Sequence, residues 1–115
     1  MTSVEILRDA DGKICEFRSH GHTGYAEAGR DLVCAGVSSI LQTAVLGLEE
    51  YLKLSCKVEQ EKGHLSCQVE RDIFLNREID AILETMVLGL RAIEREYPGH
   101  LKVEEVVGHA NISKI

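Results

Sequence analysis

The chain has 115 residues, 44% hydrophobic and 28% charged, which is long enough for one domain with a core and too short for two. Its 19 acidic and 13 basic residues give a net charge of −6 with no basic cluster, which disfavours a nucleic-acid partner. It has no run of about 18 consecutive apolar residues, and its N-terminus lacks the basic-then-apolar order of a signal peptide. We therefore expect a cytoplasmic protein with no membrane partner.

The N-terminal part of the chain is predicted to form a β-hairpin. Residues 3–9 show a loose alternation of apolar and polar side chains, and residues 13–20 give a second run of the same kind. Between them, Asp11 and Gly12 form a dipeptide that strongly favours a tight hairpin turn. A glycine-rich loop follows the second strand.

From residue 31 the apolar period changes from that of a strand to that of a helix. Apolar residues recur at three- and four-residue steps, which predicts an amphipathic helix ending near Lys53. They are Val33, Val37, Ile40, Leu41, Ala44, Leu48 and Leu52. Asp31 is predicted to be the N-cap of this helix, because its carboxylate can accept the free N–H groups of the first turn.

The second half of the chain repeats the order strand, strand, helix. Residues 55–60 and 65–70 alternate around a turn at Lys62 and Gly63, with Cys56 and Cys67 predicted to share one face.

A second helix is predicted over residues 77–97, ended by the Pro98-Gly99 pair. A fifth strand is expected over 101–107, and residues 108–115 are expected to be a frayed tail. The resulting order is β-β-α-β-β-α-β. Because each helix has one apolar stripe to bury, we predict a single α+β domain over residues 1–115, a two-layer sandwich with both helices packed on a sheet.

Cys34 and His22 form a candidate catalytic pair. With Asp31 as N-cap, Cys34 is the third helical residue, where free N–H groups and the helix dipole favour a thiolate. His22 can hold that thiolate as an ion pair and then protonate a leaving amine. The alternatives are a small core cysteine and a solvated loop histidine.

Several neighbours support this pair with roles that the sequence leaves open. Gly21, Gly24 and Gly29 serve either tight turns or a loop that closes over a bound peptide. Ser38 lies one turn after Cys34 and bonds either within the site or to a backbone carbonyl. Asp31 can orient His22 as well as cap the helix.

A metal or redox role has less support. His20, His22 and Cys34 supply three possible zinc ligands, but no fourth is evident, so we expect no metal and no cofactor. Cys15, together with Cys56 and Cys67, is expected to be a reduced core thiol. A redox sensor would need a resolving cysteine near Cys34, and Cys15 is the only neighbour by sequence.

The stretch from Gly21 to Ser38, GHTGYAEAGRDLVCAGVS, closely resembles the signature of the ribosomal-processing cysteine proteases, the Prp family of bacteria. That pattern is approximately GHxGxAxxGxDxVCAxVS. The matching positions are Gly21, His22, Gly24, Ala26, Gly29, Asp31, Val33, Cys34, Ala35, Val37 and Ser38. Thr23 stands where the family often has alanine. The chain length and the element order also agree with the family.

The resemblance implies a function as well as a fold. It implies that Cys34 is the nucleophile and His22 its general acid and base. The implied substrate is the N-terminal extension of ribosomal protein 27 of the large subunit, cut after a short hydrophobic, aromatic-rich segment. A homodimer and a loop that reshapes around the peptide are implied too. The alternative from a different class is a non-catalytic acidic module that binds a basic ribosomal protein or an assembly factor.

Overall fold

The computed structural model describes residues 1–21 and 28–108, with the backbone alone for residues 28–31. The strands are β1 (Thr2–Arg8), β2 (Ile14–His20), β3 (Cys56–Glu61), β4 (His64–Val69) and β5 (Leu101–Val107). The helices are α1 (Ala28–Leu46), which continues into a π-helical turn (Gly47–Tyr51), and α2 (Asn76–Glu96), which follows a 3-10 turn (Ile73–Leu75). The predicted β-β-α-β-β-α-β order is confirmed. Of the expected tail over residues 108–115, Gly108 donates its N–H to the Arg8 carbonyl at 2.7 Å, and residues 109–115 lie outside the described part of the chain.

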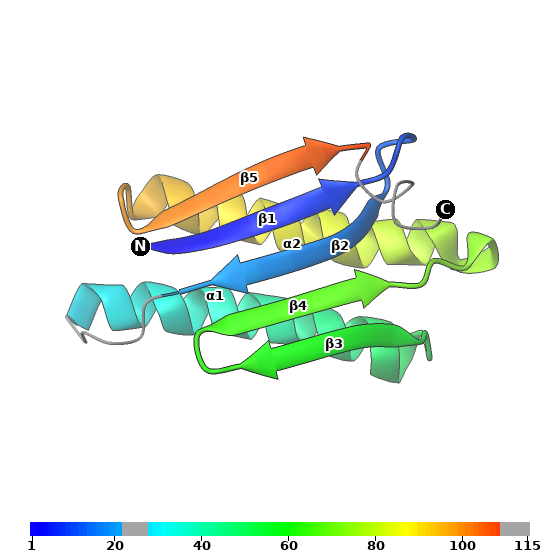
Figure 1. Cartoon of the computed structure of the whole chain (residues 1–115), viewed down its shortest axis with the longest axis horizontal. Coiled ribbons are helices and arrows are strands. Elements are labelled where there is room, and N and C mark those ends of the chain that lie inside the picture. The colour runs from blue at the N-terminus through cyan, green and yellow to red at the C-terminus, as the bar shows by residue number, and fades with distance from the viewer. Residues whose placement is uncertain (22–27, 109–115) are drawn as a thin grey trace.

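The five strands form one mixed sheet in the order β3-β4-β2-β1-β5, with both helices on the same face (Figure 1). Neighbouring strands are antiparallel except β1 and β5, which are parallel with Val4 opposite Val103. The α+β two-layer architecture is therefore confirmed. α2 connects β4 to β5 by passing over the face of the sheet that carries the helices. The last strand therefore pairs with the first, and β1 is an internal strand between β2 and β5.

The core lies between the sheet and the two helices. Alternate side chains of each strand point toward the helices, as the period of a β-strand requires. The fully buried members of this core with the largest side chains are Phe17, Ile6, Ile14, Leu41, Leu48, Ile79, Leu83, Leu90, Val4, Val33 and Cys67. In the β3–β4 pair, Cys56 lies opposite Val69, and Val58 opposite Cys67, so the predicted shared face of Cys56 and Cys67 is confirmed.

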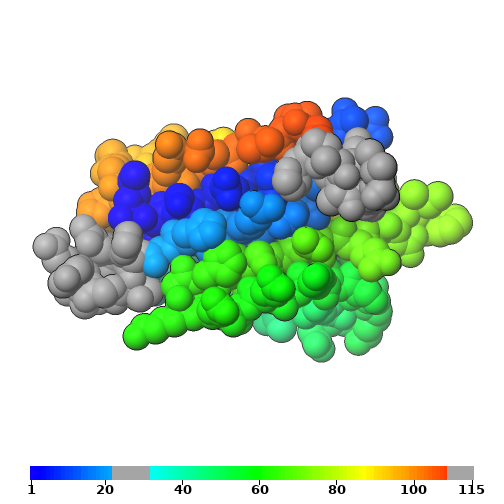
Figure 2. Space-filling view, in the orientation of Figure 1, coloured from blue at the N-terminus to red at the C-terminus, as the bar shows by residue number. Residues whose placement is uncertain are grey.

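The opposite face of the sheet carries charged side chains. Figure 2 looks onto this face, where no helix covers the strands in the described part of the chain. Arg18 Nε lies 2.8 Å from Glu16 Oε2, and its Nη1 lies 3.8 Å from Glu5 Oε1. A sheet with one apolar and one polar face needs helices on one side only, which explains the two layers.

Both predicted glycine turns are confirmed by left-handed backbone. Gly12 has φ of 81° and Gly63 has φ of 77°, a region that glycine adopts at little cost. In the first hairpin the Asp9 carboxylate also accepts the N–H groups of Asp11 and Lys13, at 2.9 and 3.0 Å. The first hairpin is therefore held by its own side chains as well as by strand pairing.

The start of α1 differs from the prediction. The helix begins at Ala28, so Asp31 is its fourth residue and not its N-cap, and Cys34 is its seventh residue and not its third. Ala28 is a strong helix former, and one glycine at position 29 costs only about 1 kcal/mol, too little to stop the helix. An acidic residue is also favourable anywhere in the first turn, so Asp31 marks the helix start without being its cap.

α1 is long and apolar enough, from Leu32 to Tyr51, to meet the length and composition of a membrane-crossing helix, with a mean hydropathy of 1.6. Core helices of globular domains pass the same test. Here Val33, Val37 and Leu41 are among the buried residues that the helix packs against the sheet and α2. The buried part of this window, 28% of it, belongs to the core of the domain.

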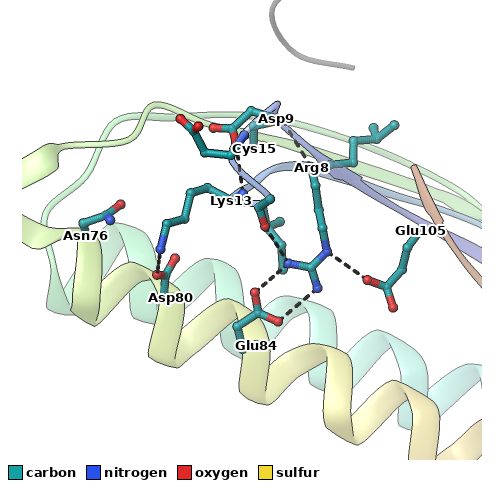
Figure 3. Close-up of polar contacts among 12 residues, drawn as sticks. Arg8, Asp9, Lys13, Cys15, Asn76, Asp80, Glu84 and Glu105 are labelled. Atoms are coloured by element: carbon teal, nitrogen blue, oxygen red, sulfur yellow. Dashed lines mark hydrogen bonds and ion pairs between the residues drawn. The ribbon is translucent and has the colours of Figure 1, made fainter. Parts of the chain in front are cut away.

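Polar contacts fasten α2 to the sheet at the end of the molecule where β1 turns into β2 (Figure 3). Arg8 Nη1 and Nη2 donate to the two carboxylate oxygens of Glu84 on α2, at 2.7 and 3.0 Å. Arg8 Nε donates to Glu105 on β5 at 2.9 Å. These hydrogen bonds, led by the one to Glu84, raise the pKa of Arg8. The guanidinium thus joins β1, β5 and α2.

Asp80 on α2 makes a second set of polar contacts between α2 and the rest of the molecule. Its carboxylate lies 2.6 Å from Lys13 Nζ and 2.6 Å from Arg71 Nη2. Burial by itself would raise the pKa of Asp80, but the hydrogen bonds and charges of Lys13 and Arg71 outweigh it and leave this pKa below its ordinary value. The ionised carboxylate is therefore the form that the fold stabilises.

Asp80→Asn should destabilise the protein at pH 7 by about 1–2 kcal/mol, because it removes the negative charge and replaces one of the two acceptor oxygens by an NH₂ group that faces a cation. A carboxyl with a depressed folded pKa contributes stability above its unfolded value, about 3.9, and loses it as the pH falls through the folded value. The gap in melting temperature between wild type and variant should therefore narrow below about pH 4. Thermal unfolding from pH 7 to pH 2 measures this difference in melting temperature.

The matched control is Glu59→Gln, at an exposed site on β3. Its melting temperature should stay close to that of wild type at every pH. A difference between Asp80→Asn and wild type that does not change with pH would contradict the expectation.

Candidate active site

Cys34 lies in the second turn of α1, with its side chain half-buried. Its Sγ is 3.1 Å from the hydroxyl oxygen of Thr2, the first residue of β1. In Figure 1 the beginning of β1, the end of β2 and the first turns of α1 lie at the same end of the molecule. The cysteine is therefore neither a fully buried core residue nor a free surface thiol.

Cys34 lines a cavity of about 280 Å³ between α1, the sheet and the β3–β4 hairpin. The lining residues from the sheet and its turns are Thr2, Ser19, Gly21, Gln60, Glu61, Gly63, His64 and Leu65. Those from α1 are Cys34, Ala35, Val37, Ser38, Leu41 and Gln42. The volume suits one or two side chains of a bound peptide and is below that of most enclosed ligand sites, roughly 300–1,000 Å³.

Ser38 lies one turn after Cys34 and lines the same cavity. Its Oγ accepts a hydrogen bond from Gln42 Nε2 at 2.8 Å, and Gln42 also lines the cavity. This hydrogen bond joins two side chains of the cavity wall, and the choice between the two roles that the sequence leaves open for Ser38 stays a prediction. Ser38 and Gln42 together supply a hydroxyl and an amide beside the thiol.

Gly21 joins the end of β2 to the cavity. Its N–H donates to the Gly63 carbonyl at 2.9 Å, which ties this residue to the β3–β4 turn. Of the other predicted loop residues, Gly29 lies in the first turn of α1. His22 and Gly24 lie outside the described residues, so the pairing of His22 with Cys34, or with Asp31, stays a prediction.

A histidine pair near the site was not predicted from the sequence. His20 and His64 lie opposite each other on β2 and β4, with their Nδ1 atoms 3.1 Å apart. Glu5 Oε1 lies 3.9 Å from His20 Nε2. Only the strand pairing brings these residues together, because 44 positions separate the two histidines. Their proximity has no local sequence signal.

The metal alternative loses support from the sheet geometry. Ser19 faces the cavity, so the next residue, His20, points to the opposite face of the sheet from Cys34. Within residues 1–21 and 28–108, no group of three or more His, Cys, Asp or Glu side chains is arranged to hold a metal ion. His20 and Cys34 therefore do not converge on one ion.

The redox alternative fails on distance. Cys15 Sγ donates to the Leu7 carbonyl at 3.2 Å, whereas Cys34 contacts Thr2. Thr2 and Leu7 are five residues apart on one strand, about 17 Å at the rise of a β-strand, and a disulfide needs Cα atoms within about 7 Å. Cys15 is not positioned to resolve an oxidised Cys34.

The other two thiols interact with each other. A hydrogen bond between Cys56 and Cys67, together with burial, raises the pKa of the Cys67 thiol, and the same hydrogen bond lowers the pKa of Cys56. Cys67 is buried and Cys56 half-buried. Cys67 is the core thiol that the sequence predicts, whereas Cys56 and Cys15 are only partly buried.

Comparison with known proteins places this arrangement in context. A family model described as Cysteine protease Prp matches residues 1–102. The chain is 31% identical over 107 residues to the ribosomal processing cysteine protease Prp of Staphylococcus aureus, covering 90% of this chain and 97% of that one. It is also 31% identical over 111 residues to the Prp of Bacillus subtilis, covering 90% and 96%.

Solved structures give the same answer for the fold. The S. aureus Prp in complex with a substrate peptide superposes with a TM-score of 0.82 at 28% identity, covering 91% of this chain and 99% of that chain. The same protease with a covalently linked product peptide gives a TM-score of 0.78, also at 28% identity and with the same coverage. Both similarities cover 91% of this chain, so they concern the fold as a whole.

Proposed function

The chain belongs to the Prp family of ribosomal processing cysteine proteases, and we propose that it removes the N-terminal extension of ribosomal protein 27 of the large subunit. In this proposal Cys34 is the nucleophile and His22 is its general acid and base. The observation that carries it is the half-buried Cys34 thiol on the wall of a cavity beside the end of β2. Gly21, which also lines that cavity, directly precedes His22 in the sequence.

The reaction is an acyl transfer through a thioester. The Cys34 thiolate attacks the scissile carbonyl carbon, and the tetrahedral intermediate collapses as the C–N bond breaks. His22 supplies the proton that the departing amine takes up, and then removes a proton from the water that hydrolyses the thioester. The relative from S. aureus has been crystallised with a covalently linked product peptide, which supports a covalent mechanism in this family.

The start of α1 does not supply the oxyanion donors in this proposal. Cys34 was expected in the first turn of its helix, beside free N–H groups. In the structure it lies in the second turn, beyond the four N–H groups that a helix leaves unpaired. Ser38 and Gln42 are the polar side chains beside the thiol on α1, so we propose the Ser38 hydroxyl as a donor to the developing oxyanion.

The cavity also supports a basic peptide as substrate. Glu61 lies on its rim, exposed, and the chain as a whole carries a net charge of −6. Val37, Leu41 and Leu65 provide an apolar wall for a hydrophobic side chain of the peptide. An acidic rim over an apolar wall attracts a basic segment and then buries one of its apolar residues.

The proposed assembly is a homodimer in the cytoplasm, where ribosomal proteins are made. Light scattering on the purified protein tests the first part and should give twice the mass of one chain. A mass equal to one chain over the concentration range of the activity assay would rule out the dimer as the active species.

A peptide copying the N-terminal extension of the ribosomal protein tests the function. Mass spectrometry should find one defined cut, and pretreatment with iodoacetamide should abolish it in proportion to modification of Cys34. Modification of Cys56 alone should leave the cleavage rate unchanged. If the untreated protein binds the peptide without cutting it, the non-catalytic binding module is the better assignment. If it neither cuts nor binds, the proposed substrate is wrong.

A further inference from the structure

Thr2 makes the hydrogen bond to the proposed nucleophile and belongs to no part of the GHTGYAEAGRDLVCAGVS signature. Its Oγ1 lies 3.1 Å from Cys34 Sγ, within the range of a hydrogen bond to sulfur. The threonine is only 5% exposed, whereas Cys34 is half-buried. The hydroxyl therefore reaches the sulfur from the interior, and the other side of the sulfur is open to the cavity.

The backbone around Thr2 holds this hydroxyl in place. Thr2 N–H donates to the His100 carbonyl at 3.2 Å, and Thr2 pairs with Leu101 of β5. Like Val4, it points toward the helices, because alternate residues of a strand share a face. A β-branched side chain also has few rotamers, so the direction of Oγ1 is well defined.

Gly21 lies beside the threonine. A Cβ at Gly21 would lie 3.4 Å from Thr2 Oγ1 and 3.7 Å from its Cγ2, which is ordinary van der Waals contact, so the two residues are neighbours. Thr2, Gly21 and Cys34 line the same cavity. The contact between Thr2 and the thiol is thus built into the meeting point of β1, β2 and α1.

The protonation state of Cys34 determines which of the two atoms donates the hydrogen bond. A thiol and a hydroxyl can each donate to the other, but a thiolate has no proton and can only accept. Once Cys34 ionises, the Thr2 O–H must donate to Sγ, and hydrogen bonds to an ion are roughly twice as strong as neutral ones. The contact therefore favours the thiolate over the thiol.

We propose that Thr2 is a positioning residue: its buried hydroxyl stabilises the Cys34 thiolate and holds the sulfur toward the substrate cavity. The inference rests on the proposed role of Cys34 as nucleophile. It adds a donor from β1 to the His22 partner that the family signature supplies. This stabilisation is lost once the sulfur is part of a neutral thioester. The hydroxyl therefore stabilises the thiolate in the free enzyme and until the thiolate has attacked the substrate.

The test is the pH profile of Cys34 alkylation in wild type, Thr2→Val and Thr2→Ser. Short iodoacetamide pulses from pH 5 to pH 10 are followed by mass spectrometry of the Cys34 and Cys56 peptides. Valine keeps nearly the shape of threonine without its hydroxyl, so the midpoint of the Cys34 profile should move up by about one pH unit. On the rising, acid side of the profile this is about tenfold slower alkylation at the same pH. Thr2→Ser keeps the hydroxyl and should stay close to wild type.

The Cys56 profile is the internal control and should not change, and thermal unfolding checks that each variant is folded. A Cys34 profile that is unchanged in Thr2→Val, or moves equally in Thr2→Ser, overturns the inference. Peptide cleavage by Thr2→Val should fall by up to about tenfold on the acid side of the measured Cys34 profile and by less above its midpoint.

The two proposals can fail separately. If wild type does not cut the peptide but the Thr2→Val alkylation profile moves, the positioning role stands and the proposed substrate fails. If wild type cuts the peptide and the profile does not move, the protease assignment stands and the role of Thr2 is wrong.

Discussion

Cys34→Ala should reduce peptide cleavage to background while leaving the melting temperature within a few degrees of wild type. Loss of the nucleophile from a catalytic unit lowers kcat by a factor on the order of 10⁶, because no other group can form the covalent intermediate. Cys34 is half-buried and its thiol has one hydrogen bond, to Thr2, among the described residues, so little packing is lost. The measurement is the rate of product formation by mass spectrometry beside a thermal unfolding curve.

Cys56→Ala is the matched control for this substitution. Cys56 is also half-buried, and the hydrogen bond with Cys67 lowers its pKa, so Cys56 is another thiol that could react. It lies on β3 and does not line the Cys34 cavity. Cleavage should persist in this variant. Retained cleavage in Cys34→Ala, or its loss in Cys56→Ala, would move the nucleophile away from Cys34.

His22→Ala should lower kcat roughly 10²–10⁴-fold, the usual contribution of a positioned general acid and base. The expectation comes from the signature and from Gly21, which precedes His22 and lines the cavity with Cys34. KM should change much less than kcat, because the imidazole moves protons and is not proposed to bind the peptide. Steady-state kinetics across pH 5–9 separates the two parameters.

His100→Ala controls for the loss of any histidine, since His100 lies in the turn before β5 and does not line the cavity. Its backbone carbonyl, which accepts the Thr2 N–H, is retained. This variant should keep the wild-type kcat. If His22→Ala instead raises KM at constant kcat, His22 binds substrate and another group transfers the proton.

Local patterns in the sequence were sufficient for the secondary structure. Strand alternation, helical spacing and the Asp11-Gly12 and Lys62-Gly63 turns act over a few neighbouring residues, and the structure confirms each of these elements. The exception is the start of α1, where Asp31 is compatible with both the cap and the first turn. The position of one acidic residue does not distinguish an N-cap from a residue of the first turn. The wrong choice shifted the predicted position of Cys34 in the helix by about one turn.

The sequence by itself also determined the family, because the GHTGYAEAGRDLVCAGVS signature combines glycine spacing, a histidine and a cysteine in one short segment. Only the tertiary structure decided that Thr2 meets Cys34, that Ser38 and Gln42 share their cavity, and that His20 pairs with His64. Thr2 and Cys34 are 32 positions apart, and their contact depends on α1 crossing the end of β1. Such contacts arise from the order of strands and the packing of the helix on the sheet, which no local spacing encodes.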